Sequence, residues 1–286
     1  MADISAALVK ELRERTSVGM MDCKKALQEC GGEIEAAIDW LRQKGLSKAA
    51  KKAGRATSEG LIGFKAAPDN SVAAIVEVMC ETDFVARGDQ FKAFAAAVAA
   101  KVFDGNPADS DALAALIGDG LSNQIATLGE NMSIGRFIRF AAEQPGLVGA
   151  YIHSNGKIGV LVELGAKNAA SLARPEMLEL AKNIAMQVAA TNCLALDPGS
   201  LDPVVVERER EVHRQKTLDE GKPANIVDKI VEGRIQKFYQ EVCLTEQAYI
   251  RDDKVTIKAL VNDHGKSLGD EITVRRFARL QLGEGS

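Results

Sequence analysis

Apolar residues near the N-terminus recur at the spacing of an amphipathic helix. Ile4, Leu8 and Leu12 stand four positions apart, which places them on one helical face. The segments DCKKALQEC and EIEAAIDWLRQKG continue the helical pattern, and the second ends at Gly45, a residue type that commonly terminates helices. Because three short helices can close a small core, the pattern predicts a three-helix module. The basic, alanine-rich segment LSKAAKKAGRATSEG follows as a predicted helical linker.

Beyond Gly60 the apolar pattern changes to the period of two that is typical of strands. LIGFKAAPDNSVAAIVEVMC predicts two strands around the turn P-D-N-S, and DQFKAFAAAVAAKVF returns to helical spacing. Further helical segments follow, and then a strand pair around IGRFIRFAAE and LVGAYIHSNGKIGVLVEL. Near the C-terminus we expect strand character in YIRDDKVTIKALV, and one more strand with a frayed tail in ITVRRFARLQLGEGS.

The two halves of this central region resemble each other. VAAIVEVM…FKAFAAAVAA matches IGVLVELG…LELAKNIAMQVAA in pattern and order, and this alignment places Phe94 on Ile184 and Val98 on Val188. In each half a hairpin leads into a helix. The sequence therefore predicts an internal duplication of one α/β unit.

A polar segment interrupts the second half of the core. Two charged helical stretches flank E-G-K-P, in which the glycine ends the first helix and Pro223 lies in the first turn of the second. The segment is too polar to form a core, so we expect a helical hairpin that protrudes from the second half. The predicted class is α+β, with a three-helix module, a duplicated core of two antiparallel-sheet subdomains and this hairpin. The predicted boundaries are 1–54 for the module, 55–145 and 146–200 with 243–286 for the two subdomains, and 201–242 for the hairpin.

The short connection E-T-D-F-V, between a predicted strand and a predicted helix, carries an acidic residue and a large aromatic one. One interpretation packs Phe84 beneath the sheet and uses Thr82 or Asp83 to cap the next turn. The other exposes Phe84 for contact with a partner. The corresponding junction of the second half, GAKNAASLARPEM, has neither an aromatic nor an acidic residue before its helix. Since that copy does without them, the pattern favours the partner contact.

Adjacent methionines occur at the start of the second predicted helix. Met20 and Met21 cannot both face one helical core, because neighbouring residues do not share a face. Either one of them fills the small core, or they offer an adaptable apolar contact to a partner. Lys24, just beyond, is by its pattern a solvated charge.

Composition and charge narrow the possible functions. Among the 286 residues 46% are hydrophobic and the net charge is −4, so no global basic field draws the chain to nucleic acid. The five cysteines are scattered and form no C-x-x-C pair, which predicts neither a zinc site nor a disulfide framework. We also find no signal-peptide core and no apolar run of about 18 residues. We therefore expect a soluble, cytoplasmic protein without membrane contact.

The common catalytic motifs are missing from the sequence. It contains no phosphate-binding G-x-x-x-x-G-K-[ST], no H-E-x-x-H and no G-x-S-x-G, and its three histidines lie far apart. We accordingly predict that the protein is not an enzyme and uses neither a cofactor nor a metal ion of its own.

Three blocks of sequence resemble one known family. ALVKELRERTSVGMMDCKKAL, ETDFVAR, and HSNGKIGVLVEL with the charged hairpin after it look like bacterial elongation factor Ts, in order and over nearly the whole chain. The resemblance implies a guanine nucleotide exchange factor that binds the GTPase elongation factor Tu in its GDP form. It would displace Mg²⁺ and promote GDP release so that GTP can rebind. The N-terminal module would then be UBA-like, and the hairpin would be a coiled coil that supports a homodimer or a 2:2 complex, or makes an accessory contact.

The resemblance also assigns roles to residues. The family's T-D-F-V loop, which acts on the magnesium site of the partner, falls here on Thr82, Asp83, Phe84 and Val85. The other partner contacts would fall on Met20, Met21, Lys24, Leu128, Gly129, His153 and Ile250. Some relatives continue into a C-terminal helical module, whose contact we expect to be absent here. The alternative function is a non-catalytic adaptor that binds peptides or ribosome-associated chains through the N-terminal module, regardless of GDP.

Overall fold

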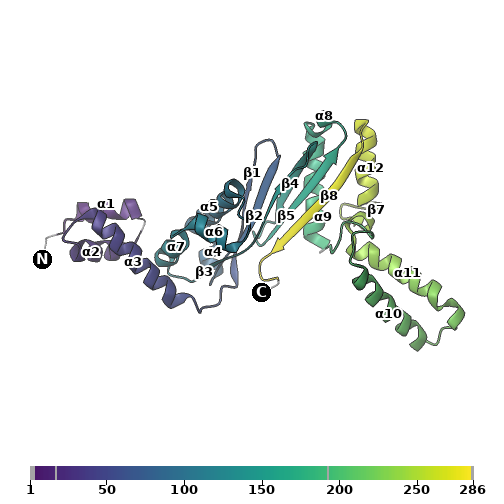
Figure 1. Ribbon diagram of the computed structural model, residues 1–286, viewed down its shortest axis with the longest axis horizontal. Coiled ribbons are helices and arrows are strands. Elements are labelled where there is room, and N and C mark those ends of the chain that lie inside the picture. The colour runs from purple at the N-terminus through teal and green to yellow at the C-terminus, as the bar shows by residue number, and fades with distance from the viewer. Residues whose placement is uncertain (1–3, 17, 192, 285–286) are drawn as a thin grey trace.

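The computed structural model describes residues 4–16, 18–191 and 193–284, which form an elongated molecule (Figure 1). A small helical module lies at one end, two sheets with their helices lie in the middle, and a helical hairpin lies at the other end. Helices and antiparallel sheets occur in separate layers, which confirms the predicted α+β class. Within the described ranges, no helix combines the length and the apolar character needed to cross a membrane.

The N-terminal module is built from short helices around a few apolar side chains. Its helices are α1 (Ala6–Thr16), α2 (Met20–Glu29) and the first part of α3 (Ile34–Lys52). Leu12, Leu27 and Ala37 are fully buried between them. Gly31 and Gly32, both with positive φ, turn the chain from α2 into α3. The helical spacing in the sequence therefore reflects a real, though small, core.

Helix α3 connects this module to the rest of the protein without a break. The sequence predicts that it ends at Gly45, and that prediction is wrong. Gly45 is buried where α3 crosses α7 (Gly120–Leu128), and a Cβ built on it would lie 3.5 Å from the Cβ of Ala126. The glycine thus permits a close approach of two helices instead of ending one. Arg42 of α3 also pairs with Asp119 beside α7, so the module is mounted on the core.

The first core subdomain is a three-stranded antiparallel sheet covered by a helix on one face. Its strands, in the spatial order given, are β1 (Glu59–Ala66), β2 (Val72–Cys80) and β3 (Met132–Ala141). Its helices are α4 (Asp83–Arg87), α5 (Asp89–Gly105), α6 (Ser110–Ile117) and α7. Phe91, Phe94 and Val98 of α5 are buried against the sheet, in the helical register that the sequence predicts.

The second core subdomain repeats this arrangement. Its sheet contains, in spatial order, β4 (Gly146–Ile152), β5 (Ile158–Ala166) and β8 (Ile272–Gln281). Its other elements are α8 (Ala169–Leu172), α9 (Pro175–Thr191), the 3-10 helix Leu244–Glu246, β6 (Ala248–Tyr249), β7 (Asp252–Thr256) and α12 (Ile257–Leu268).

One predicted strand in this subdomain is partly wrong. The sequence assigns strand character to all of YIRDDKVTIKALV, but its second part begins α12. Thr256 caps that helix, because its side chain accepts a hydrogen bond from the backbone N–H of Ala259. Ile257, Val261 and Gly265 are then buried at helical spacing. A short apolar run is compatible with either structure, and here the cap is the signal that the prediction missed.

The two sheets pack face to face, and each carries its long helix on the outside. Ile75 of β2, Leu161 of β5 and Leu280 of β8 belong to one apolar layer between the sheets. The alternate residues of β2, such as Val76, face α5 instead. The core therefore has four layers, in the order α5, first sheet, second sheet and α9 (Figure 1). This explains why β2 and β5 are buried on both faces and apolar almost throughout.

The internal duplication is present, but its register differs from the predicted one. β2 and β5 each contain nine residues, α5 and α9 each contain 17, and the connections 81–88 and 167–174 match in length. The matched helices therefore place Phe94 on Leu180 and Val98 on Ile184, one helical turn from the predicted alignment. Residues four apart share a face of a helix, so a shift of one turn preserves most of the apolar pattern.

The repeat also includes segments beyond those that the predicted duplication covered. L-G-E-N-M-S-I-G-R-F, over α7 and β3, corresponds to L-G-D-E-I-T-V-R-R-F, over α12 and β8. Both helices end at a glycine with positive φ, Gly129 and Gly269, and an acidic residue follows each glycine. This second match is visible in the sequence, but it lies outside the segments on which the predicted duplication was based.

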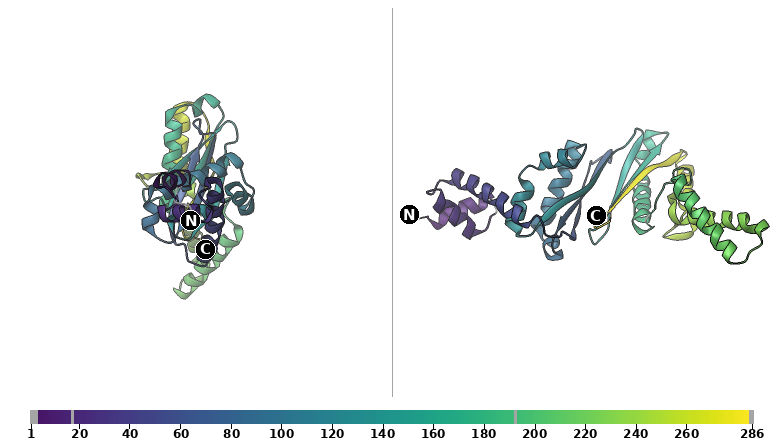
Figure 2. Two further views of the ribbon diagram at one scale, coloured as in Figure 1. Left: turned by 90° about the vertical axis from the view of Figure 1, so that its left-hand side faces the viewer. Right: turned by 60° about the horizontal axis from the view of Figure 1, so that its bottom comes forward.

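The helical hairpin is inserted into the second repeat between α9 and β6. It consists of α10 (Pro203–Asp219) and α11 (Ala224–Val242). Val227, Val231 and Ile235 are buried between the two helices, and ion pairs such as Arg210–Glu232, at 2.9 Å, cross its surface. Figure 2 shows the hairpin and the N-terminal module at opposite ends of the molecule.

The crossing of α3 and α7 predicts how position 45 responds to substitution. Gly45→Ala adds only an ordinary contact with Ala126 and removes the conformational cost of a glycine inside a helix. It should therefore raise the free energy of unfolding by about 0.5–1 kcal/mol. Gly45→Leu should lower it by about 1–3 kcal/mol, because its extra atoms overlap α7. Urea denaturation measures both, and equal stability of the two variants would contradict a close crossing.

Candidate functional site

The T-D-F-V segment does not form the predicted loop but a short helix, the five-residue α4. Thr82 has an extended backbone and caps the helix, since its hydroxyl oxygen accepts a hydrogen bond from the backbone N–H of Val85 at 3.3 Å. Asp83 has a different role. Its carboxylate pairs with Arg87, one turn later, at 2.9 Å. A Thr followed by Asp is a usual helix start, and the capping role that the sequence offered for Thr82 is confirmed.

Phe84 projects from α4 into solvent. It is 84% exposed, whereas Ala86 of the same helix is buried and Val85 packs against the core of the first subdomain. The interpretation that packs Phe84 beneath the sheet is therefore wrong. A large exposed aromatic side chain on a capped helix is a typical anchor for a protein partner.

The turn after α7 supports this helix. One carboxylate oxygen of Glu130 accepts hydrogen bonds from the backbone N–H groups of Glu81 and Thr82, at 3.1 and 3.0 Å. The other accepts from the Thr82 hydroxyl at 2.5 Å. The sequence pattern gives no signal for Glu130, because these contacts join segments that are far apart in the sequence.

Cys80 lies directly beneath the start of α4. Its thiol is buried and donates a hydrogen bond to the carbonyl oxygen of Thr82 at 3.2 Å. Burial, together with the nearby charge of Glu130, raises the pKa of the Cys80 thiol to about 11. At neutral pH the group is therefore a protonated hydrogen-bond donor that supports the backbone, and not a nucleophile.

The predicted contacts Leu128 and Gly129 lie beside α4. Leu128 is half-buried and packs partly against the first core. Gly129 has a φ of +81° and ends α7 in the left-handed conformation that glycine favours. The structure thus brings these two residues close to Thr82 through their neighbour Glu130.

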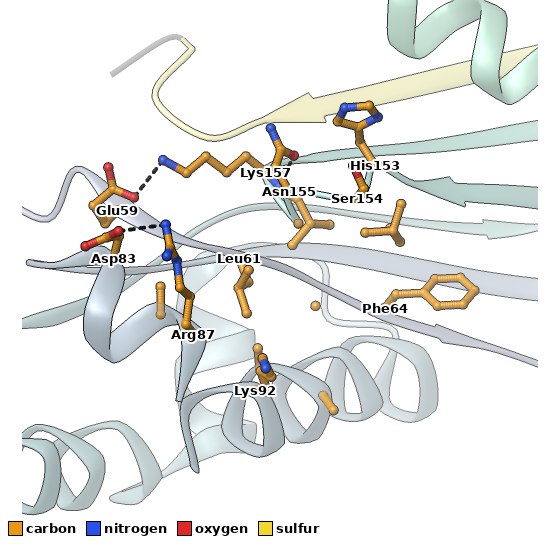
Figure 3. Close-up of a pocket in the computed structure, with 18 residues that line it drawn as sticks. Glu59, Leu61, Phe64, Asp83, Arg87, Lys92, His153, Ser154, Asn155 and Lys157 are labelled. Carbon is orange, nitrogen blue, oxygen red and sulfur yellow. Dashed lines mark hydrogen bonds and ion pairs between the residues drawn. The ribbon is translucent and has the colours of Figure 1, made fainter. Parts of the chain in front are cut away.

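A groove of about 800 Å³ runs between the two subdomains and brings together predicted residues from both (Figure 3). Asp83 lines it from α4, and His153 lines it from the turn between β4 and β5. The His153 ring nitrogen Nδ1 is hydrogen-bonded to the Tyr151 hydroxyl at 3.0 Å. The ion pair between Glu59 and Lys157, at 2.6 Å, links the two subdomains at this groove.

The remaining predicted contacts lie towards the two ends of the molecule. Met20 and Met21 begin α2 and are 53% and 77% exposed, so neither of them fills the module core. Lys24 is exposed on the same helix. Ile250, in the turn between β6 and β7, is 48% exposed, and its backbone N–H donates to the buried Gln187 side chain at 2.8 Å. The structure holds these residues apart from α4 (Figure 1).

The described part of the chain contains no group of His, Cys, Asp or Glu side chains that could hold a metal ion. Around α4 the exposed groups are an aromatic ring, an ion-paired carboxylate and a capping hydroxyl. This set can bind and displace groups on a partner.

Known proteins match the chain over its full extent. The family model described as Elongation factor TS matches residues 81–284. Elongation factor Ts of Desulfovibrio desulfuricans is 60% identical over 283 residues, which is 99% of either chain. The chain belongs to the elongation factor Ts family. Elongation factor Ts of Lawsonia intracellularis is 52% identical, over 98% of this chain and 99% of the relative. Elongation factor Ts of Symbiobacterium thermophilum is 45% identical, over 100% of this chain and 94% of the relative.

Family membership confirms the resemblance seen in the sequence and makes the protein a translation elongation factor. The elongation factor Ts model begins at Glu81, the residue before the cap of α4. The full-length relatives also cover the N-terminal module, so the module and the core occur together in this family.

The exposure of Phe84 predicts that the side chain contributes little to folding. Phe84→Ala should change the free energy of unfolding by less than about 0.5 kcal/mol, because it removes no buried contact. Phe91→Ala in α5 is the matched control, since Phe91 is fully buried, and it should cost about 3–5 kcal/mol. Chemical denaturation compares the two variants, and a large loss for Phe84→Ala would place its ring in the core.

Proposed function

We propose that the protein is the guanine nucleotide exchange factor of the GTPase elongation factor Tu. It binds the GDP form, displaces Mg²⁺ and promotes the release of GDP, so that GTP can rebind. The observation that carries this proposal is Phe84, which is 84% exposed on a helix that is capped and supported from below.

The second repeat supports a functional role for this side chain. α8 occupies the position of α4, and Asn168 caps it as Thr82 caps α4, with its side-chain oxygen accepting from Ala170 N–H at 2.9 Å. In the matched connections, Ala170 stands where Phe84 stands. The strand–helix junction therefore forms without an aromatic residue, and Phe84 is an addition to it.

Nucleotide exchange needs no catalytic group, only differential binding. By linkage, the factor by which the protein weakens GDP binding to the GTPase equals the factor by which GDP weakens binding of the protein. A hundredfold effect corresponds to about 2.7 kcal/mol. Burial of one Phe side chain contributes about 1.5–3 kcal/mol, so insertion of Phe84 next to the nucleotide site has the right magnitude.

The partner's Mg²⁺ is the group that this insertion displaces. Mg²⁺ requires near-ideal octahedral geometry and is held largely by water, carboxylate and phosphate oxygens. Phe84 separates the segments that hold these ligands, and Asp83 anchors the inserted helix or reorders the partner's backbone. Val85 and Thr82 keep α4 on the core while it is inserted.

The other contacts give the complex its affinity. We assign partner binding to Met20, Met21, Lys24, Leu128, Gly129, His153 and Ile250, of which all but the half-buried Leu128 are exposed. They extend from the N-terminal module to the turn between β6 and β7, so the partner is held at several separated places. The hairpin, with Val204 and Val212 exposed on α10, supports a homodimer or a 2:2 complex.

Stopped-flow measurement of GDP release from elongation factor Tu tests the proposal. The wild-type protein should accelerate release, and Phe84→Ala should reduce that acceleration by about tenfold to hundredfold, from the value of one buried Phe. Leu178→Ala is the control, because it removes an exposed apolar side chain of α9 outside every proposed contact. No acceleration by the wild type would refute exchange activity, and binding that is insensitive to GDP would favour the adaptor.

The methionines of the module should affect affinity more than release. The double variant Met20→Ala with Met21→Ala removes two exposed side chains that are remote from α4. It should raise the concentration of factor needed for half-maximal release by about tenfold, since each truncation removes apolar area that binding would bury. The maximal rate should change little. A titration at fixed elongation factor Tu separates the two quantities, and a lower maximal rate would place the methionines in the displacement step.

A further inference from the structure

We propose that Glu130 is the positioning residue that sets the orientation of α4 and couples it to the partner-facing turn Leu128–Gly129. The proposal rests on the exchange function proposed above and goes one step further. It assigns a role to Glu130, a residue outside the predicted contacts that acts through its hydrogen bonds to Thr82.

The geometry around Glu130 forms a continuous chain of hydrogen bonds into the helix. Its carboxylate accepts from the N–H groups of Glu81 and Thr82 and from the Thr82 hydroxyl. The oxygen of that hydroxyl in turn accepts from the N–H of Val85, inside the first turn of α4. Hydrogen bonds to a charged carboxylate are about twice as strong as those between neutral groups. Glu130 therefore orients the cap, and the cap orients the helix that carries Phe84.

The same two segments are also bonded in the opposite direction. The side chain of Glu81 accepts a hydrogen bond from the backbone N–H of Asn131 at 2.6 Å. The side-chain amide nitrogen of Asn131 donates to the carbonyl oxygen of Arg55 at 2.7 Å, which connects the turn to the chain that leaves α3. The start of α4, the turn after α7 and the end of the module helix thus form one hydrogen-bonded unit.

A helix as short as α4 depends on such support. Five residues cannot hold a helical conformation by propensity alone, because helix nucleation is costly. Leu128 and Gly129 directly precede Glu130 in the chain. A partner that binds these two residues would therefore act on Glu130, and through the hydrogen bonds of Glu130 on the orientation of Phe84. Pre-orientation of Phe84 also lowers the entropy lost on insertion.

The second repeat contains the same device without a functional side chain. Asp270 follows α12, and its two carboxylate oxygens accept from the N–H groups of Lys167 and Asn168 at 3.2 and 3.1 Å. Asn168 then caps α8. Because α8 has Ala170 where α4 has Phe84, Asp270 supplies an internal control for a purely structural role.

The test compares Glu130→Gln, Glu130→Asp and Asp270→Asn in the full-length protein. Glu130→Gln should lower the maximal rate of GDP release by about tenfold, since misplacement of a positioned group by a fraction of an ångström is costly. Glu130→Asp should recover most of that rate, because Asp270 shows that the shorter side chain reaches two backbone N–H groups. The Asp270→Asn variant should promote GDP release from elongation factor Tu at the wild-type rate. Its unfolding midpoint should change by about as much as that of Glu130→Gln.

Equal maximal rates of GDP release with Glu130→Gln and Asp270→Asn would overturn the proposal. It would also be overturned if Glu130→Gln raised only the half-saturating concentration and left the maximal rate unchanged. Hydrogen exchange of the free protein keeps the positioning role testable if the exchange function itself fails. Glu130→Gln should then accelerate exchange of the amides in 82–87, and Asp270→Asn that of the amides in 168–172. The wild type could fail to promote GDP release while the two variants still show this accelerated amide exchange. In that case the exchange function is refuted and the positioning of α4 by Glu130 stands. Unchanged protection of 82–87 would overturn the positioning role.

Discussion

Two buried glutamates, each at a bulge in a central strand, tie the two sheets of the core together. Glu77 pairs with Arg136 of its own sheet, and that arginine also donates a hydrogen bond to the carbonyl oxygen of Gln281 in the other sheet. Glu163 and Arg276 make the equivalent link in the opposite direction. A buried carboxylate requires complete pairing, so both links restrict how the sheets can lie. The groove between the subdomains, and the residues that line it, depend on this constraint.

The same constraint extends to the N-terminal module through a continuous helix and to the hairpin through a buried hydrogen bond. α3 runs from the module onto α7, and Gly45 lets the two helices approach closely. At the other end, Gln187 and Gln247 share a buried hydrogen bond that joins α9 to the base of the hairpin. Separated contact surfaces on one connected frame lose less entropy when they engage a partner together. Under the exchange function proposed above, such a frame would make the free energy of the distant contacts available to the insertion of α4.

Local patterns in the sequence predicted the elements whose cause is local, and they failed where the cause is a distant contact. The helical spacing of Phe91, Phe94 and Val98 and the apolar strands needed no tertiary information. Gly45 was misread because a glycine in a helical pattern suits either a terminus or a close crossing, and only α7 decides between them. Thr82, Asp83 and Phe84 are predicted as a contact because an aromatic residue at a strand–helix junction is unusual, and that role stays a prediction. Glu130 was missed because its hydrogen bonds reach Glu81 and Thr82, 49 and 48 residues earlier.

The duplication separates what the fold requires from what function adds. Both repeats have a sheet, a long helix, a short capped helix and a carboxylate that binds the two backbone amides just before that helix, so these parts satisfy the core and the backbone. The repeats differ at the point where α4 bears Phe84 and α8 bears Ala170, and again where α10 and α11 are inserted into the second copy. An exposed Phe adds nothing to the stability of its own subdomain, because it removes no apolar area from water until a partner covers it. The ring of Phe84 can therefore contribute free energy only when another molecule covers it, which agrees with the partner contact proposed above.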